Sequence, residues 1–140
     1  MQHQSQSQRL RKTRKDHSTE IAEDYVELIA ELIQESGACR VTELARRMGV
    51  SHVTASRTVG RLASSGLVIT KHHHPVELTP KGKRLANSVR KRHQIVYDFL
   101  KHLGVSDATA DSDAEGIEHH CSIETLEAMS QALDKPRKKR

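Results

Sequence analysis

A chain of 140 residues with 35% hydrophobic and only 2% aromatic residues forms one compact unit or two very small ones around a modest aliphatic core. No apolar run approaches the roughly 18 residues of a membrane span, and the polar N-terminus does not resemble a signal peptide. Cys39 and Cys121 form no CxxC pair, which argues against a disulfide framework or a zinc site and predicts a soluble protein of the reducing cytoplasm, with no membrane contact.

The net charge of +5 is distributed unevenly along the chain. Residues 40–92 hold twelve Lys and Arg against two acidic residues. By contrast, residues 21–35 hold five acids and no base, and residues 93–134 hold nine acids and one base. A basic middle between two acidic pieces indicates a polyanion-binding module joined to a cation-binding one. Solvated helix faces without any partner are the simpler alternative.

The first segment, residues 1–17, is rich in Gln, Ser, Arg and Lys and has no hydrophobic periodicity. It is therefore predicted to be a disordered basic arm. Ser18 or Thr19 can cap a helix that extends to about residue 36. Gly37 is placed to end this helix.

Two short helices are predicted next, at residues 42–48 and 52–65, with Gly49 in the turn between them. Two β-like runs at residues 67–71 and 76–78 then form a small hairpin. Helix, tight turn, helix and hairpin is the order of a winged helix-turn-helix, which binds DNA. An ordinary helical hairpin with a basic face is the alternative.

Thr79 followed by Pro80 predicts the start of a long helix, because proline is favoured at the first helical position. Asp107 and Ser122 can each cap a further helix, over about residues 108–119 and 123–133. The expected fold class is mainly α, with a winged helix-turn-helix domain followed by an all-helical domain.

The second helix of the winged motif carries side chains suited to reading DNA. Its first turns offer short polar groups, and its arginine at position 57 could bind a guanine in bidentate fashion. The predicted DNA-binding residues are Ser51, His52, Val53, Thr54, Ser56, Arg57 and Arg61. Candidates for phosphate contacts, which position a protein without reading sequence, are Arg46, Arg47, Arg61, Lys71, Lys81 and Lys83. The three adjacent histidines at 72–74 are interpreted as a solvated hairpin tip rather than a metal site.

A second pattern consists of six ligand-type side chains in three segments: Asp24, Glu27, His93, Glu115, Glu118 and His119. The first two are three residues apart, and the last three follow an i, i+3, i+4 spacing, so each set shares a face if its segment is helical. Four carboxylates and two imidazoles suit hard or borderline divalent ions. Taken singly, each piece also fits a solvated helix face or a core histidine.

Three segments, Glu23-Asp24-Tyr25-Val26-Glu27, Arg92-His93-Gln94 and Asp113-Ala114-Glu115-Gly116-Ile117-Glu118-His119-His120, resemble the manganese-responsive MntR branch of the diphtheria-toxin-repressor (DtxR) metalloregulators. The resemblance covers about residues 20–133. It implies a homodimer with N-terminal winged-helix domains, a C-terminal helical dimerisation domain and two Mn²⁺ ions per subunit.

The same resemblance implies a role for each ligand. One ion would be held by Asp24, Glu27, His93 and Glu118, and the other by Glu27, Glu115, Glu118 and His119. In the iron-responsive relatives a methionine replaces Asp24 and a cysteine replaces Glu115. This chain matches the manganese pattern at both positions.

The expected function is that of a Mn(II)-dependent, non-enzymatic transcriptional regulator that binds a pseudo-palindromic operator as a homodimer and, by the resemblance, represses manganese uptake genes. The alternatives are a winged-helix regulator that responds to Fe(II), or to a small organic ligand or protein partner, and a dinuclear metallohydrolase built on the same ligand types. The basic helix-turn-helix argues against the hydrolase.

The expected domain divisions are a basic arm at 1–17, the DNA-binding domain at 18–80, the metal-binding and dimerisation domain at 81–134 and a basic tail at 135–140.

Overall fold

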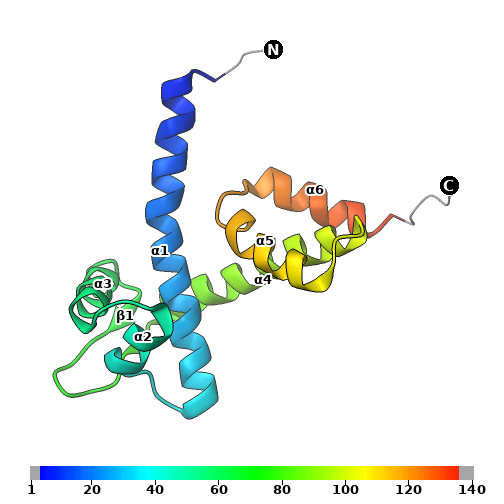
Figure 1. Cartoon of the computed structure of the whole chain (residues 1–140). Helices are drawn as coiled ribbons and strands as arrows, with labels where there is room; N and C mark the ends of the chain where they lie inside the picture. Colours follow the sequence, from blue (N-terminus) through cyan, green and yellow to red (C-terminus); the bar gives the residue numbers. More distant parts are fainter. Residues whose placement is uncertain (1–3, 136–140) are drawn as a thin grey trace. The chain divides into compact units, whose positions relative to one another are not determined.

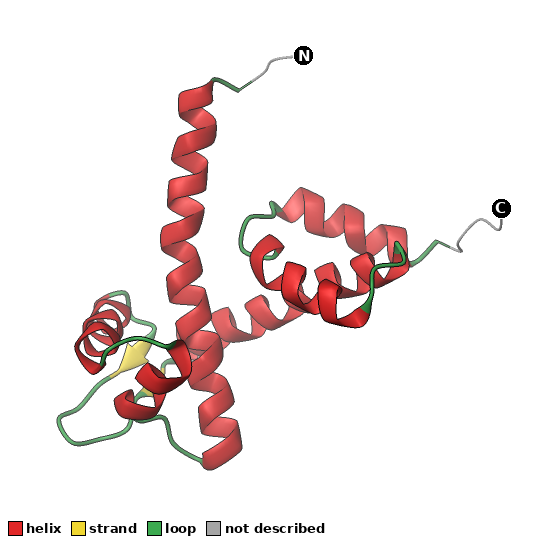
Figure 2. Cartoon of the chain, in the orientation of Figure 1, coloured by secondary structure: helices red, strands yellow, loops and turns green. Residues whose placement is uncertain are grey.

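The computed structural model describes residues 4–135, which form helices joined by loops and one two-stranded hairpin (Figures 1 and 2). The elements are α1 (Gln6–Ser36), α2 (Val41–Met48), α3 (His52–Ser64), β1 (Val68–Ile69), β2 (Glu77–Leu78), α4 (Pro80–His102), α5 (Asp107–Ile117) and α6 (Ile123–Leu133). The chain divides into two compact units. The winged unit comprises residues 21–88, and the helical unit comprises the described parts of 1–20 and 89–140.

The winged unit has the predicted helix-turn-helix and hairpin. Gly49 follows α2 with φ 68°, a left-handed conformation that glycine adopts without steric cost and that allows the chain to turn sharply into α3. The two strands pair antiparallel, with Val68 opposite Leu78 and Ile69 opposite Glu77. The aliphatic core of the winged unit joins the second half of α1 to α2, α3 and the hairpin. It includes Val26, Ile29, Leu32, Leu44, Val59, Leu62, Val68 and Val76.

The helical unit packs the second half of α4 against α5 and α6 around Val96, Ala114 and Leu126. Ser122 caps α6 as predicted, because its Oγ accepts the Thr125 N–H at 3.2 Å. The prediction that Asp107 caps α5 is wrong, since Ser106 occupies the N-cap position and makes no side-chain cap there.

Asp107 is instead the first residue of α5. Its Oδ1 lies 2.5 Å from Lys101 Nζ, an ion pair that joins the end of α4 to the start of α5. A carboxylate in the first helical turn also interacts favourably with the helix dipole. The predicted helix at 108–119 ends earlier than expected, at Ile117.

The first segment also differs from the prediction. The expected helix start at Ser18 or Thr19 is wrong, because α1 begins at Gln6 and the arm expected to be disordered is helical over residues 6–17. The segment lacks Gly and Pro and is rich in Gln, Arg and Lys, which are good helix formers. It also extends a helix whose second half is packed, so each added residue gains a hydrogen bond without a new nucleation step. Residues 1–3 of the arm and 136–140 of the predicted basic tail lie outside the described residues.

The division between the two compact units falls inside α4, after Ser88, because the first turns of this helix belong to the winged core through Ala86. The domain boundary expected at residue 80 stays a prediction. Within residues 4–135, no helix combines the length and the apolar character that crossing a membrane requires.

Gly82 lies where the first turn of α4 meets the chain entering the hairpin. A Cβ at this position would lie 2.1 Å from the backbone oxygen of Leu67. We therefore expect Gly82→Ala to lower the free energy of unfolding by about 1–3 kcal/mol, the usual cost of overpacking, in urea titrations followed by circular dichroism.

The matched control is Gly60→Ala in α3, where nothing lies within 4 Å of the added Cβ. Alanine has the higher helix propensity, so this variant should be more stable by about 0.5–1 kcal/mol. Equal stability of the two variants would contradict the packing described at Gly82.

Candidate metal centre and nucleic-acid interface

The helical unit brings together four of the six predicted ligands, and three of them, His93, Glu115 and Glu118, form one cluster. His93 Nδ1, on α4, lies 2.8 Å from Glu118 Oε2 and 3.5 Å from Glu115 Oε1. One ligand atom from each of these three residues lies within 4.8 Å of the other two. Glu118 is fully buried, whereas Glu115 is exposed at the edge of the cluster.

Glu118 follows the last residue of α5, yet its φ of −57° and ψ of −32° remain in the right-handed helical region. The i, i+3 relation to Glu115 therefore holds although the helix is shorter than predicted. The next residue, His119, is also buried, and its Nε2 lies 3.3 Å from Glu118 Oε1. The two oxygens of the buried carboxylate thus face two different imidazoles.

The cluster contains an acidic residue that was not predicted. Asp111 Oδ1 lies 3.1 Å from His93 Nε2, so that both ring nitrogens of this histidine face carboxylates. Asp111 precedes Glu115 by four residues on α5, and this i, i+4 spacing is the sequence signal that could have identified it.

The electrostatics of the cluster favour a positive charge at His93. Burial lowers the pKa of this imidazole, but the carboxylates of Glu118, Asp111 and Glu115 together outweigh burial, and the pKa is raised above its ordinary value. The same negative potential would favour a divalent cation.

These residues fit a divalent cation. A fully buried carboxylate is costly unless positive charge or hydrogen bonds compensate it. Bonds from oxygen and imidazole ligands to divalent cations are about 2.0–2.6 Å long, so ligands of one ion lie within about 5 Å of each other. The 4.8 Å limit of the His93 cluster meets this condition, and its oxygen-rich donor set without sulfur suits the harder ions.

The remaining predicted ligands, Asp24 and Glu27, belong to the winged unit. Both lie on α1, are half-buried and are separated by three residues, with the buried side chains of Tyr25 and Val26 between them in sequence. The predicted common helix face for this pair is therefore present.

All seven predicted DNA-binding residues lie on the exposed surface of α3 or at its N-cap. Ser51 has a structural role there, since its Oγ accepts the Thr54 N–H at 3.1 Å and lies 2.9 Å from Thr54 Oγ1. Val53 is 60% exposed, which is unusual for an apolar side chain and suits contact with a thymine methyl group. Arg57 and Arg61, one turn apart, extend this surface along the helix.

Three of the six candidates for phosphate contacts already have partners in the protein. Arg46 pairs with Glu43 at 2.6 Å and Arg47 with Glu35 at 3.2 Å, while Lys81 Nζ donates to Ser65 O at 2.9 Å. The other three candidates are Arg61, Lys71 and Lys83, and their side chains make no hydrogen bond or ion pair with another described residue. The second group is the more available for phosphate.

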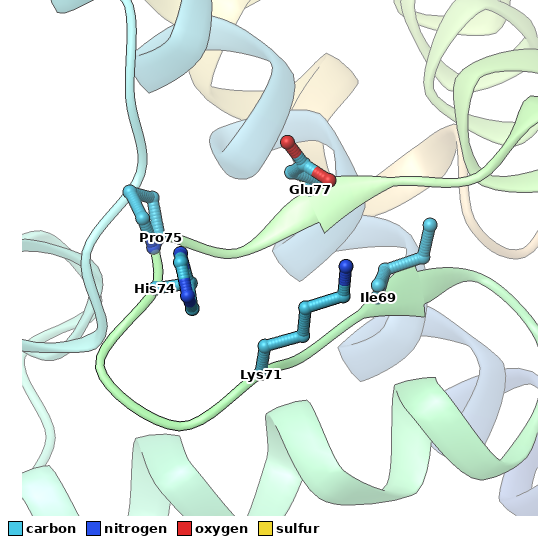
Figure 3. Close-up of a pocket in the computed structure, with 5 residues that line it drawn as sticks. All are labelled: Ile69, Lys71, His74, Pro75 and Glu77. Carbon is cyan, nitrogen blue, oxygen red and sulfur yellow. The ribbon is translucent and has the colours of Figure 1, made fainter.

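A surface hollow lies between the start of α2, α3 and the hairpin, and its lining includes Arg40, His52, Ser56 and Lys71. A second hollow lies over the hairpin, lined by Ile69 and Lys71 on one side and by His74, Pro75 and Glu77 on the other (Figure 3). Among residues 4–135, none of the hairpin histidines belongs to a group of ligand-type side chains close enough to share an ion.

Comparisons with known proteins match both halves of the chain. Residues 17–76 match the family model described as iron dependent repressor, N-terminal DNA binding domain, and residues 79–140 match the model of the metal binding and dimerisation domain of the same repressors. The transcriptional regulator MntR of Salmonella typhimurium is 49% identical over 119 residues, which cover 85% of this chain and 76% of the relative. The regulator of the same name from Bacillus pumilus is 34% identical over 112 residues, covering 80% of this chain and 78% of the relative.

Solved structures of metal-dependent regulators have a fold similar to that of this chain. A manganese-dependent transcriptional repressor in complex with manganese has a TM-score of 0.72 and 34% identity, covering 82% of this chain and 53% of that one. IdeR of T. acidophilum has a TM-score of 0.70 and 25% identity, covering 82% of this chain and 55% of that one. This chain therefore spans little more than half of the length of these solved chains.

Proposed function

Because the chain belongs to the MntR branch of the iron-dependent repressor (DtxR) family, we propose that it is a cytoplasmic, manganese-dependent transcriptional regulator that represses manganese uptake genes. The observation that carries the proposal is the fully buried Glu118, whose two oxygens face His93 and His119 within the region that matches the metal-binding domain model. The exposed basic surface of α3 supports DNA as the partner.

We assign two Mn²⁺ ions to each subunit. Asp24, Glu27, His93 and Glu118 are proposed to hold one ion, and Glu27, Glu115, Glu118 and His119 the other. The convergence of His93, Glu115 and Glu118 supports the assignment on the helical unit. On the winged unit, the assignment is supported by the half-buried pair Asp24 and Glu27, because their carboxylates share one face of α1.

The regulatory mechanism follows from the charge of these ligands. The four carboxylates repel one another, so in the metal-free protein they disfavour any arrangement that brings the pair Asp24 and Glu27 close to Glu115 and Glu118. A bound divalent cation supplies the positive charge that reverses this repulsion. Metal binding would thereby select, from a broader ensemble of arrangements of the two units, the arrangement that fits DNA. Coupling of this kind is typically about 1–3 kcal/mol, or about 5- to 150-fold in DNA affinity.

The decisive experiment titrates Mn²⁺ into metal-free protein while fluorescence anisotropy reports binding to a labelled DNA selected from random sequence by the Mn²⁺-loaded protein. Sequence-specific binding should appear only with the metal. Parallel titrations with Fe²⁺ under anaerobic conditions test the alternative effector. Metal-independent binding would contradict the proposal and favour a regulator that responds to an organic ligand, whereas hydrolysis of phosphate or peptide substrates would favour the metallohydrolase.

We further propose a homodimer formed through the region from about residue 83 to 133. In the helical unit, Leu103 is 58% and Ile123 is 76% exposed, which leaves large apolar side chains in contact with water. Ile123→Glu should shift the dimer toward monomer in sedimentation experiments at micromolar concentration. Ile69→Glu is the control, because Ile69 is an exposed isoleucine of the hairpin and lies outside the proposed interface. Identical association of the two variants would contradict this interface.

Base reading by α3 can be separated from phosphate contact. Arg57→Ala should reduce discrimination between the selected site and random DNA by about 1–3 kcal/mol if Arg57 binds a guanine in bidentate fashion. Arg61→Ala, further along the same helix, should weaken binding to both DNAs equally and make the salt dependence less steep, as the loss of a phosphate contact does. Equal losses on both DNAs for Arg57→Ala would exclude base reading by this residue.

A further inference from the structure

Glu20 is an acidic residue of the helical unit that has no place in the ligand set above. Its side chain is 24% exposed, and its Oε2 lies 3.2 Å from His120 Nε2 and 3.6 Å from His17 Nδ1. The helix therefore holds this carboxylate directly beside the turn that follows α5.

That turn carries the metal-ligand candidate His119 immediately before His120. One oxygen of Glu20 and one ring nitrogen of His119 lie within 4.8 Å of each other, a separation at which both atoms can bind one ion. His119 is buried, and its Nε2 is 3.3 Å from Glu118 Oε1. Glu20 thus adds a carboxylate on the α1 side of this histidine.

The sequence of α1 is consistent with this placement. Glu20 precedes the proposed ligands Asp24 and Glu27 by four and seven residues, the spacing that stacks side chains on one helix face. All three positions on this face carry carboxylates, and the next residue at this spacing, Glu31, pairs with Arg47.

We propose that Glu20 is an additional oxygen ligand for the cation that His119 binds, and that it raises the coordination number there in favour of Mn²⁺. The proposal rests on the proposed function, because it assumes the metal centre at Glu118 and His119. A further hard oxygen ligand favours ions that accept six or more ligands over zinc, which commonly takes four.

The test compares Glu20→Gln, which keeps the shape of the side chain and removes its charge, with Asp16→Asn. Asp16 is the matched control, because its Oδ2 also faces His120, at 3.6 Å from Nδ1, one turn earlier on α1. Free Mn²⁺ is measured by electron paramagnetic resonance during titration of the full-length metal-free protein, and the absorption spectrum of the Co²⁺-loaded protein reports coordination number. Circular dichroism confirms that each variant is folded, and Glu20→Ala replaces Glu20→Gln if that variant does not fold.

The expected result is an affinity for Mn²⁺ at least about 10-fold weaker at one site in Glu20→Gln, the lower end of the loss seen when a residue that supports a metal ligand is removed. Co²⁺ absorption should strengthen in the same variant, because a lower coordination number intensifies it, and Asp16→Asn should match the wild type. Unchanged affinity and spectrum in Glu20→Gln, or equal losses in both variants, would overturn the proposal. Glu118→Ala, measured in parallel, separates failure of the Glu20 proposal from failure of the proposed metal centre. If Glu118→Ala also retains full Mn²⁺ binding, the metal centre itself is wrong.

Discussion

Replacing Glu118 with Ala is expected to abolish the Mn²⁺ response of DNA binding. The side chain is fully buried and faces His93 at 2.8 Å and His119 at 3.3 Å, so one substitution removes a ligand from both proposed ions. The lost coupling should reduce the affinity for the selected DNA in excess Mn²⁺ by about 5- to 150-fold, to the level of the metal-free protein. Fluorescence anisotropy with and without Mn²⁺ measures this difference.

Two further variants make the Glu118 experiment specific. Glu118→Gln keeps the volume of the buried side chain, so a loss shared by both variants cannot come from a cavity. His74→Ala removes an exposed imidazole at the hairpin, where it lines a pocket together with Lys71 and Glu77 (Figure 3). The His74 variant should keep the full metal response, and a Mn²⁺ titration in which it behaved like Glu118→Ala would contradict the ligand assignment.

Exchanging Asp24 for Met and Glu115 for Cys is expected to shift the metal response from Mn²⁺ toward Fe²⁺ and Co²⁺. Both changes replace a hard carboxylate oxygen with sulfur, which suits ions later in the Irving–Williams order. Glu115 is exposed at the edge of the His93 cluster, so a smaller thiol fits without repacking the core. DNA binding against each metal under anaerobic conditions gives the order of preference.

The control for this exchange is Asp113→Cys combined with Glu31→Met. Asp113 is an exposed carboxylate two residues before Glu115 on α5, and Glu31 is exposed on α1. This pair introduces the same two sulfur atoms on the same two helices, outside the proposed ligand set. An unchanged Mn²⁺ preference in the Asp24 and Glu115 variant would show that selectivity arises from other residues, among which Glu20 and Asp111 are the nearest candidates.

The sequence by itself determined the features that depend on residues close together in the chain. Gly49 ends α2, Pro80 begins α4 and Ser122 caps α6, because a turn, a helix start or a cap requires a particular residue type at a fixed spacing. The same holds for the ligand spacing Glu115, Glu118, since an i, i+3 pair lies on one helix face wherever the helix packs.

Only the tertiary structure decided which polar groups meet across the chain. His93 faces Asp111 across 18 residues and Glu20 faces His120 across 100, and no local periodicity predicts either pair. Helix formation in residues 6–17 also depended on context, because the segment has no apolar stripe of its own and continues a helix nucleated by packed residues. Ion pairs also determined which basic side chains are available for phosphate. Arg46 and Arg47 pair with acidic side chains of the winged unit, and this leaves Arg61 the more available.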